Sequence, residues 1–445
     1  MPPTVLQVGE GRFLRAFFGS LLDEARARGA LTARIVLTAP RRSGAGQLAE
    51  LRARGGRYRV VVRGPGGDAV REIAPYARII DGFAERADLL AEIAVPRSLV
   101  ILSNTTEAGL AYRPEEAGVA QTYPARLTTW LELRRRAGVT APVAIIPCEL
   151  LAANAGVLRA AVLRHAEAWG LPAEALLAPV VFLETLVDRI VTSDDPADAL
   201  ACFTEPYSAF YIGGAPAWVR AALPLDEAVV HWVEDVAEAR ERKVRLLNGT
   251  HTLMAVLGLQ MGVETVLQAL EHADLGALLR AALLEDGVGS FPPPARPAAR
   301  AFALETLARL ENPAQRDTLA RLALQLSAKV RARWTPILEG CRAEAGRYPE
   351  PFVLGLAAYL RLAAAPGVAP VDLATLDDPA WIGRLRAGWS EDAAAFVATA
   401  ARDADWPAPV DPELLGGVAR QLSGLIRSGV AAHLAGLRRL GQPPP

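Results

Sequence analysis

Lysine is almost missing from this chain of 445 residues. All but two of its 48 Lys and Arg residues are arginine, and the exceptions are Lys243 and Lys329. Arginine stays protonated in proteins, whereas a buried lysine can release its proton near neutral pH. A composition that favours arginine therefore makes each remaining lysine a candidate for chemistry that arginine cannot do. The alternative is that the two lysines remain in the sequence by chance.

Cysteine, net charge and long apolar runs are also scarce, and each absence excludes a class of protein. The cysteines, Cys148, Cys202 and Cys341, are too far apart for a disulfide framework or paired zinc knuckles, which favours a reducing compartment. A formal net charge of −1 gives no electrostatic reason to bind nucleic acid or an anionic membrane. No uncharged apolar run reaches the roughly 18 residues that span a bilayer, and the N-terminus lacks a signal-peptide pattern. We expect a cytoplasmic protein with a small-molecule substrate.

Motifs of several enzyme classes are absent as well. The sequence contains no H-E-x-x-H, no G-x-S-x-G and no P-loop. Most of its histidines are isolated and are expected on helix surfaces or in the core: His165, His231, His272 and His433. We therefore expect no metal cofactor.

The N-terminal half alternates β-branched runs with helical patterns. Strands are expected at 4–8, 33–39, 98–104 and 143–149, and helices at 12–29, 84–94 and 124–137. A hairpin is expected over 58–73, around the turn Gly64-Pro65-Gly66-Gly67. Continuous apolar strands that alternate with helices predict an α/β fold with a Rossmann-like, doubly wound parallel sheet.

The C-terminal half is helical in its period almost throughout. Helices are expected near 238–260, 263–286, 296–310, 314–332, 350–364, 391–402 and 412–439. The change in pattern predicts two domains. Residues 1–230 form the Rossmann-like dinucleotide-binding domain, and residues 231–445 form a mainly α-helical substrate and catalytic domain.

The first predicted strand ends in a glycine-rich turn. Gly9 and Gly11 stand where a helix begins, which is half of the G-x-G-x-x-G fingerprint for a dinucleotide's pyrophosphate. Leu14 occupies the place of the third glycine. The second strand lacks an acidic residue for a ribose 2′-hydroxyl and is followed by Arg41 and Arg42. These arginines either suit a 2′-phosphate or are solvated loop residues.

Polar residues follow another buried strand at the same predicted edge. The stretch S-N-T-T-E-A-G brings Asn104 and Thr105 to the carboxyl ends of the strands, where open α/β sheets bind ligands. The alternative is a helix-capping turn. In L-V-D-R-I-V-T, Asp188 and Arg189 lie between apolar neighbours, as site residues or as a structural ion pair.

Lys243, Asn248 and His251 form the strongest candidate for chemistry. On an α-helix with about 100° per residue they fall at roughly 0°, 140° and 80°, so they can share one side. A lysine can exchange a proton, an asparagine can donate to an oxygen that gains negative charge, and a histidine can orient a hydroxyl. The alternative is a solvated helical face.

Several stretches together resemble the polyol-specific long-chain dehydrogenases, the mannitol dehydrogenase family. They are VLQVGEGRFLRAF, SNTTEAG, YPARLT, IIPCELL, LVDRIVT and ERKVRLLNGTHT. The resemblance implies hydride transfer with NAD and no metal, with Lys243 as the acid/base, Asn248 in the oxyanion site and His251 at the substrate. We expect the cofactor to contact these residues: Gly9, Gly11, Arg12, Phe13, Asn104, Thr105 and Asp188.

The stretch P-C-E-L is similar to the hexuronate branch of this family, which implies a keto-uronate substrate bound by Glu149 and Asn154. Lys329 is a further candidate, because a substrate carboxylate would bind a cation. We expect interconversion of D-tagaturonate and D-altronate with NAD, or with NADP if Arg41 and Arg42 bind a 2′-phosphate. The alternatives are fructuronate, mannitol or another polyol as substrate, or a nucleotide-binding regulatory protein without catalysis.

Overall fold

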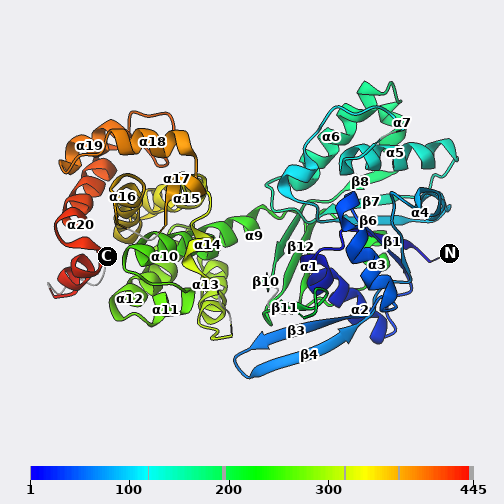
Figure 1. The fold of residues 1–445 in the computed structure, drawn as a ribbon, viewed down its shortest axis with the longest axis horizontal. Coiled ribbons are helices and arrows are strands. Elements are labelled where there is room, and N and C mark those ends of the chain that lie inside the picture. Colours follow the sequence, from blue (N-terminus) through cyan, green and yellow to red (C-terminus); the bar gives the residue numbers. More distant parts are fainter. Residues whose placement is uncertain (1, 119, 193–196, 315–316, 369–370, 440–445) are drawn as a thin grey trace. The chain divides into compact units, whose positions relative to one another are not determined.

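The chain divides into two compact units, Met1–Ala239 and Arg240–Pro445 (Figure 1). The structure is a computed structural model that describes residues 2–118, 120–192, 197–314, 317–368 and 371–439. Among the described helices, none combines the length and the apolar character needed to cross a bilayer.

The N-terminal unit is built on a parallel sheet with the strand order β5-β2-β1-β6-β7-β8. Its strands are β1 (Thr4–Val8), β2 (Arg34–Thr38), β5 (Arg78–Ile79), β6 (Leu99–Ser103), β7 (Val143–Pro147) and β8 (Val180–Phe182). The order reverses beside β1, since β2 lies on one side of it and β6 on the other. This confirms the predicted Rossmann-like sheet.

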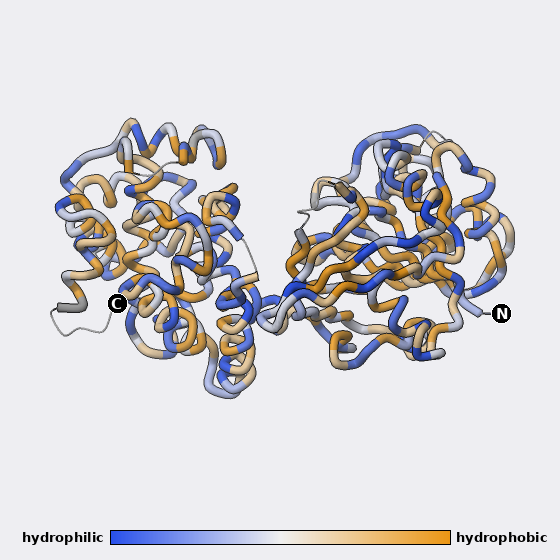
Figure 2. Tube along the Cα trace, turned by 60° about the horizontal axis from the view of Figure 1, so that its bottom comes forward, coloured by the Kyte–Doolittle hydropathy of each residue, from blue (hydrophilic) through white to orange (hydrophobic). Residues whose placement is uncertain are grey.

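Helices cover both faces of this sheet because its strands are apolar in both directions. Val5 and Val100 pack with the continuous helical run α1 (Arg12–Leu14), η1 (Arg15–Gly19) and α2 (Ser20–Ala27). Leu6 and Ile101, one position further along, pack with α4 (Arg86–Ile93), α5 (Tyr123–Arg136) and α6 (Asn154–Ala168). Figure 2 shows the hydrophobic residues concentrated along these central strands. Burial on both faces is what a doubly wound sheet requires.

The strand register brings four chain segments to one edge of the sheet. Val8 pairs with Thr38 on β2 and with Ser103 on β6, and Ser103 pairs with Pro147 on β7. These residues end their strands, so the loops that follow all leave the sheet at its carboxyl edge. Ligands of open parallel sheets bind at this edge.

Two smaller sheets complete the N-terminal unit. The predicted hairpin is confirmed as β3 (Tyr58–Gly64) and β4 (Gly67–Ile73), which pair antiparallel with Gly64 opposite Gly67. It belongs to the sheet β10-β11-β3-β4, with β10 at Val191–Thr192 and β11 at Cys202–Thr204. The other sheet has the order β13-β12-β9, with β9 at Thr185–Asp188, β12 at Ala209–Gly213 and β13 at Val230–Val233.

The C-terminal unit is helical, as predicted. Its central helix, α10 (Gly249–Gln260), is buried along nearly its whole length, and α16 (Glu350–Ala364) packs against it within one hydrophobic core. A helix that is apolar on all sides belongs in such a core. The other helices include η4 (Lys243–Asn248), α11 (Val266–Glu271), α12 (Ala273–Ala281), η5 (Ala282–Gly287), α13 (Arg296–Leu310), α18 (Pro379–Ala387), α19 (Ala393–Ala400) and α20 (Pro412–Arg439).

The prediction of one helix over 314–332 is wrong. The structure has α14 (Leu319–Leu322) and then α15 (Leu326–Ala345), separated at Gln325, whose φ of 53° lies in the left-handed region. The N–H of Gln325 donates to Leu376 O at 2.6 Å. A contact with a residue far along the chain thus stabilises the break, and local periodicity does not record it.

Candidate active site

The glycine-rich turn after β1 has the features of a nucleotide-binding turn. Gly9 has a φ of 145°, and a Cβ there would lie 2.9 Å from Leu14 Cδ1 and 3.2 Å from Asn104 O. Only glycine meets both conditions without strain. A Cβ at Gly11 would meet nothing within 4 Å, so the space before the helix at Arg12 is open. A dinucleotide's pyrophosphate fits such an opening at a helix N-terminus.

The residues after this turn divide between solvent and core. Arg12 is exposed, whereas Phe13 stacks on Phe17 with ring centroids 5.1 Å apart. Leu14, in the place of the third glycine, is buried beneath Gly9. Cofactor contacts by Arg12 and Phe13 stay predictions.

Asn104, Thr105 and Glu149 hold the ends of β6 and β7 together. Asn104 Nδ2 donates to Cys148 O at 2.7 Å, and the Thr105 N–H donates to Glu149 Oε1 at 2.7 Å. Ser103 Oγ also donates to Glu149 Oε1, at 3.1 Å. Burial raises the pKa of Glu149, which is 3% exposed, and these hydrogen bonds partly oppose that rise. Glu149 thus shapes the edge of the site, and its contact with substrate stays a prediction.

Asn154, at the start of α6, is 1% exposed and has both ends of its amide in use. Nδ2 donates to Pro147 O and to Thr185 Oγ1, both at 3.0 Å. Oδ1 accepts from the N–H of Thr185 at 3.2 Å and from that of Ala155 at 2.9 Å. Asn154 therefore ties the carboxyl end of β7 to β9. A substrate contact by this residue stays a prediction, and the geometry favours a positioning role.

Asp188 ends β9 and is 5% exposed, opposite Ala209 on β12. It therefore lies in a three-stranded sheet and not in the main parallel sheet. Its neighbour Arg189 donates to two backbone carbonyls, Ala16 O at 2.8 Å and Glu205 O at 3.2 Å. The guanidinium of Arg189 thus reaches the backbone of η1, and a cofactor contact by Asp188 stays a prediction.

Lys243 and Asn248 begin and end a π-helix, η4, that joins α9 (Ala237–Arg242) to α10. The N–H of Gly249 donates to Val244 O, five residues earlier. Hydrogen bonds over five residues bring positions i and i+5 nearly above one another, so the separation of about 140° expected on an α-helix is wrong here. The π-helix places Lys243 and Asn248 on one side. His251, 7% exposed, follows in the first turn of α10.

Side chains of α15 hold the junction of η4 with α10. Arg333 Nη1 donates to Asn248 O at 3.3 Å and to Thr252 Oγ1 at 3.0 Å, and Trp334 Nε1 donates to Gly249 O at 3.0 Å. These donors satisfy carbonyls where the hydrogen-bond pattern changes. Burial lowers the pKa of Arg333 to about 10, so it remains charged at neutral pH. Arg333 therefore brings a positive charge beside Asn248.

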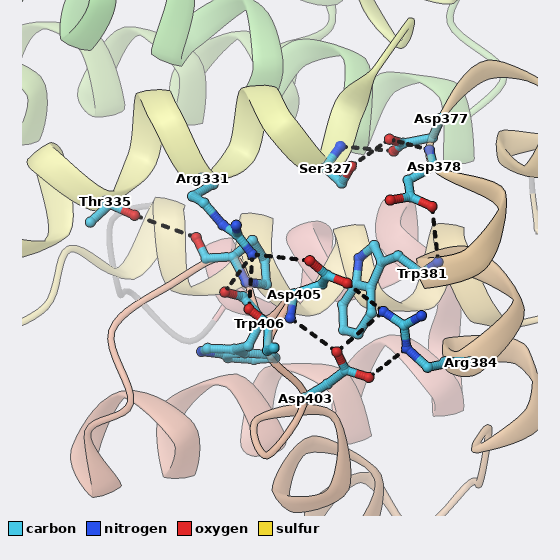
Figure 3. Close-up of polar contacts among 12 residues, drawn as sticks. Ser327, Arg331, Thr335, Asp377, Asp378, Trp381, Arg384, Asp403, Asp405 and Trp406 are labelled. Carbon is cyan, nitrogen blue, oxygen red and sulfur yellow. Dashed lines mark hydrogen bonds and ion pairs between the residues drawn. The ribbon is translucent and has the colours of Figure 1, made fainter.

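Lys329 lies on α15, one turn before Arg333. Its Nζ donates to Leu322 O at 3.1 Å, and burial lowers its pKa to about 8, with the charges of Arg333 and Arg321 adding to the effect. The first turn of α15 is held by Asp377, which accepts from the N–H of Ser327 at 2.7 Å and from its hydroxyl (Figure 3). Asp377 also opposes the fall in the pKa of Lys329.

Each unit thus holds part of the predicted site, while Asp188 lies in a separate sheet. The N-terminal group lies at the sheet edge and includes Gly9, Gly11, Asn104 and Thr105. The C-terminal group lies on η4, α10 and α15. Sequence reasoning missed Arg333 and Asp377. The spacing of four between Lys329 and Arg333 was a signal for the first, whereas nothing local pointed to the second.

A parallel sheet with a glycine-rich first turn, together with a helical unit that carries Lys243, Asn248 and His251, is typical of a dinucleotide-dependent oxidoreductase. Residues 3–223 match the family model of the mannitol dehydrogenase Rossmann domain, and residues 235–382 match that of the mannitol dehydrogenase C-terminal domain. The chain belongs to the mannitol dehydrogenase family of oxidoreductases.

Proteins that are similar to this chain support the family assignment. The chain is 33% identical to an altronate oxidoreductase of Halalkalibacterium halodurans, over 81% of this chain and 75% of the relative. It is 30% identical to the altronate oxidoreductase of Bacillus subtilis, over 90% of this chain and 87% of the relative. The fold is similar to that of Pseudomonas fluorescens mannitol 2-dehydrogenase in complex with NAD and D-mannitol, with a TM-score of 0.74, 22% identity and coverage of 99% of this chain and 95% of that one.

Proposed function

We propose that this chain interconverts D-tagaturonate and D-altronate by hydride transfer with a nicotinamide dinucleotide, the activity of a tagaturonate reductase or altronate oxidoreductase. The observation that carries the proposal is the pair of cations on α15. Lys329 and Arg333 lie one turn apart, and Arg333 donates to the backbone of Asn248. A keto-uronate carries a carboxylate that these charges attract, whereas mannitol and fructose are neutral. The altronate oxidoreductases named above support the same choice.

The reaction assigns a distinct task to each residue of the C-terminal group. In the oxidation, neutral Lys243 accepts the hydroxyl proton of the carbinol, and in the reduction the ammonium returns it. The side-chain amide of Asn248 donates a hydrogen bond to the same oxygen as negative charge develops on it. His251 orients a neighbouring hydroxyl. The bound cofactor accepts or supplies the hydride, and the open space before Arg12 suits its pyrophosphate.

A panel of substrates tests this proposal. With either reduced cofactor, the purified full chain should show its highest kcat/KM for D-tagaturonate, followed by D-fructuronate and then D-fructose. We expect at least about a tenfold loss of kcat/KM from the uronates to fructose, because each charge-assisted contact is worth about 1.5–3 kcal/mol. A preference for fructose would contradict the uronate assignment. Cofactor binding in calorimetry with no turnover on any sugar acid would favour the regulatory alternative.

The role of Lys329 predicts a pH-dependent KM. Since its pKa is about 8, Lys329 is positively charged below that pH and loses its charge above it, so KM for D-tagaturonate should rise as the pH rises beyond about 8. Lys329→Met should raise KM at pH 7 by about tenfold or more and remove the pH dependence. Lys329→Arg should also remove the pH dependence but keep a raised KM, because the planar guanidinium does not fit the space of an ammonium.

The neutral ketose D-fructose is the matched control for Lys329. It has no carboxylate, so neither variant should change its KM as strongly as that of the uronate. An unchanged KM for D-tagaturonate in Lys329→Arg would refute this role.

A further inference from the structure

A small cavity lies beside the loop that follows β2. Its volume is about 90 Å³, and its lining includes Arg42, Phe83, Arg86, Arg126 and Trp130. The loop leaves the sheet at Thr38, which is in register with Val8 at the carboxyl edge. Arginines from three separate segments therefore meet at the edge where the sheet is expected to bind its cofactor.

Arg126, on α5, lines this cavity and is 4% exposed. Its Nη1 donates to Ala39 O at 3.0 Å and Pro40 O at 3.2 Å, both in the loop after β2. Its guanidinium lies 4.1 Å from the centroid of the Phe83 ring. Within the described chain, Nη2 is buried and makes no hydrogen bond. A buried charged donor without an acceptor is costly, which points to an acceptor that a ligand supplies.

Arg42 and Arg86 add positive charge to the same cavity. Arg42 lies 5.0 Å from the centroid of the Phe83 ring and donates to Gln121 Oε1 at 3.1 Å, and Arg86 donates to Gly118 O at 2.9 Å. Burial is the main cause that lowers the pKa of Arg126 to about 10, and the charges of Arg86 and Arg42 add to it. Like charges this close repel one another, and an anion between them relieves the repulsion.

Carboxylates near the cavity are occupied elsewhere. Among the described residues, none lies within ion-pair distance of Arg42, Arg86 or Arg126. Asp81 Oδ1 accepts from the N–H groups of Phe83 and Ala84 at 3.0 and 3.3 Å, and the charge of Asp81 opposes the fall in the pKa of Arg126 without forming an ion pair with it. Glu115 accepts from the backbone of the segment at Gln121. The arginines are therefore available for a ligand's anion.

Glu10 is the feature that argues in the other direction. A Cβ at Gly44 would collide with its carboxylate, which places Glu10 beside the same loop. Its Oε2 is buried without a partner in the described chain, and burial raises its pKa, which the charges of Arg15 and Arg41 oppose. Glu10 is thus suited to accept a hydrogen bond from a ribose hydroxyl. A contact of Glu10 with the ribose 2′-hydroxyl of NAD(H) is therefore the result that would contradict an anion site.

We propose that Arg42, Arg86 and Arg126 bind the 2′-phosphate of NADP(H), so that this enzyme prefers NADP(H) to NAD(H). The inference rests on the nicotinamide cofactor of the proposed function and departs from the NAD that the family resemblance implies. Planar guanidinium groups bind phosphate oxygens through paired, charge-assisted hydrogen bonds. In Rossmann domains an arginine after the second strand accommodates this phosphate. Arg42 has this place, whereas the charge of Arg41 acts on Glu10.

Direct binding to the full chain tests the proposal without any turnover. Fluorescence titration should give a dissociation constant for NADPH at least about tenfold below that for NADH, since one charge-assisted contact is worth about that factor. Arg42→Ser should weaken NADPH about ten- to a hundredfold and leave NADH nearly unchanged. Arg86→Ser should act in the same direction. Both side chains are exposed, so these variants should fold even if substitutions of buried Arg126 do not.

Fragments of the cofactor and a control arginine sharpen the test. Adenosine 2′,5′-bisphosphate should bind more tightly than AMP, and AMP with inorganic phosphate should not reproduce the gain, which distinguishes the cofactor's phosphate from a free one. Arg28→Ser, at the end of α2 away from the glycine-rich turn, removes an exposed arginine and should change neither affinity.

The proposal is overturned if NADH binds as tightly as NADPH, or if Arg42→Ser weakens the binding of both equally. It is also overturned if the wild type prefers NADH and Glu10→Gln abolishes that preference. Reduction of D-tagaturonate with NADH alone would overturn this inference and keep the proposed function. Tight NADPH binding without turnover of any sugar acid would support this inference and overturn the proposed function.

Discussion

Lys243→Arg should lower kcat by at least about 100-fold in both directions of the reaction, because general acid/base catalysis contributes about 10²–10⁴-fold. Arginine keeps the positive charge of lysine but does not release its proton. The variant therefore separates proton transfer from simple attraction of a carboxylate. Steady-state kinetics would measure kcat, and fluorescence titration should show cofactor affinity close to that of the wild type.

The pH dependence provides the second readout for Lys243. Oxidation of D-altronate needs the neutral amine and should rise with pH, whereas reduction of D-tagaturonate needs the ammonium and should fall. Both slopes should disappear in Lys243→Arg. Lys329→Arg is the matched control at the chain's other lysine and should change KM while keeping the pH dependence of kcat. If Lys243→Arg retains most of its activity or keeps the wild-type pH dependence, the assignment of proton transfer to Lys243 is wrong, although the chain's membership of the family is unaffected.

Asn248→Ala should lower kcat by an amount of order 10²-fold, because loss of one donor to a developing oxyanion typically has that effect. The shape of the pH profile should not change, since Lys243 still exchanges the proton. The backbone at this position should stay in place without the side chain. Asn248 O is held by Arg333 Nη1 at 3.3 Å and by Thr252 Oγ1 at 3.0 Å.

Thr252→Val is the structural control for Asn248. It removes the hydroxyl that donates to Asn248 O and accepts from Arg333 Nη1, and it should lower the free energy of unfolding by about 1–3 kcal/mol, while kcat stays close to the wild-type value. Urea denaturation would measure the first quantity and steady-state kinetics the second. An equal loss of kcat in both variants would mean that Asn248 acts through helix geometry and not through its amide.

Much of the N-terminal unit could be predicted because its pattern is local. Val5 and Leu6 are both apolar and pack on opposite faces, which is the pattern of a strand buried in a parallel sheet. Gly9 could be recognised because its conformation, with a φ of 145°, requires glycine. The roles of Glu149 and Asn154 could not be predicted. Their partners, such as Thr105 in the loop after β6 and Thr185 on β9, are distant in the sequence and come near only in the folded chain.

The two arginines after β2 show the same limit. As neighbours in a polar loop, Arg41 and Arg42 are equivalent in the sequence. In the structure Arg42 turns toward Phe83, while the charge of Arg41 acts on Glu10. Their different surroundings depend on Phe83, which the chain brings to the cavity from a distant segment.

From the amino-acid sequence alone we could predict the strands β1, β2, β6 and β7 of the parallel sheet, the change from an α/β to an all-helical unit, and Lys243, Asn248 and His251 as the candidates for chemistry. The arrangement of these three residues follows from contacts that form only in the folded chain. A π-helix at Lys243–Asn248 alters the backbone hydrogen bonds, and the donors at its junction with α10 come from Arg333 and Trp334, 85 positions away from the carbonyls that they meet. Helical periodicity is a property of neighbouring residues, whereas the satisfaction of buried carbonyls depends on what packs against them.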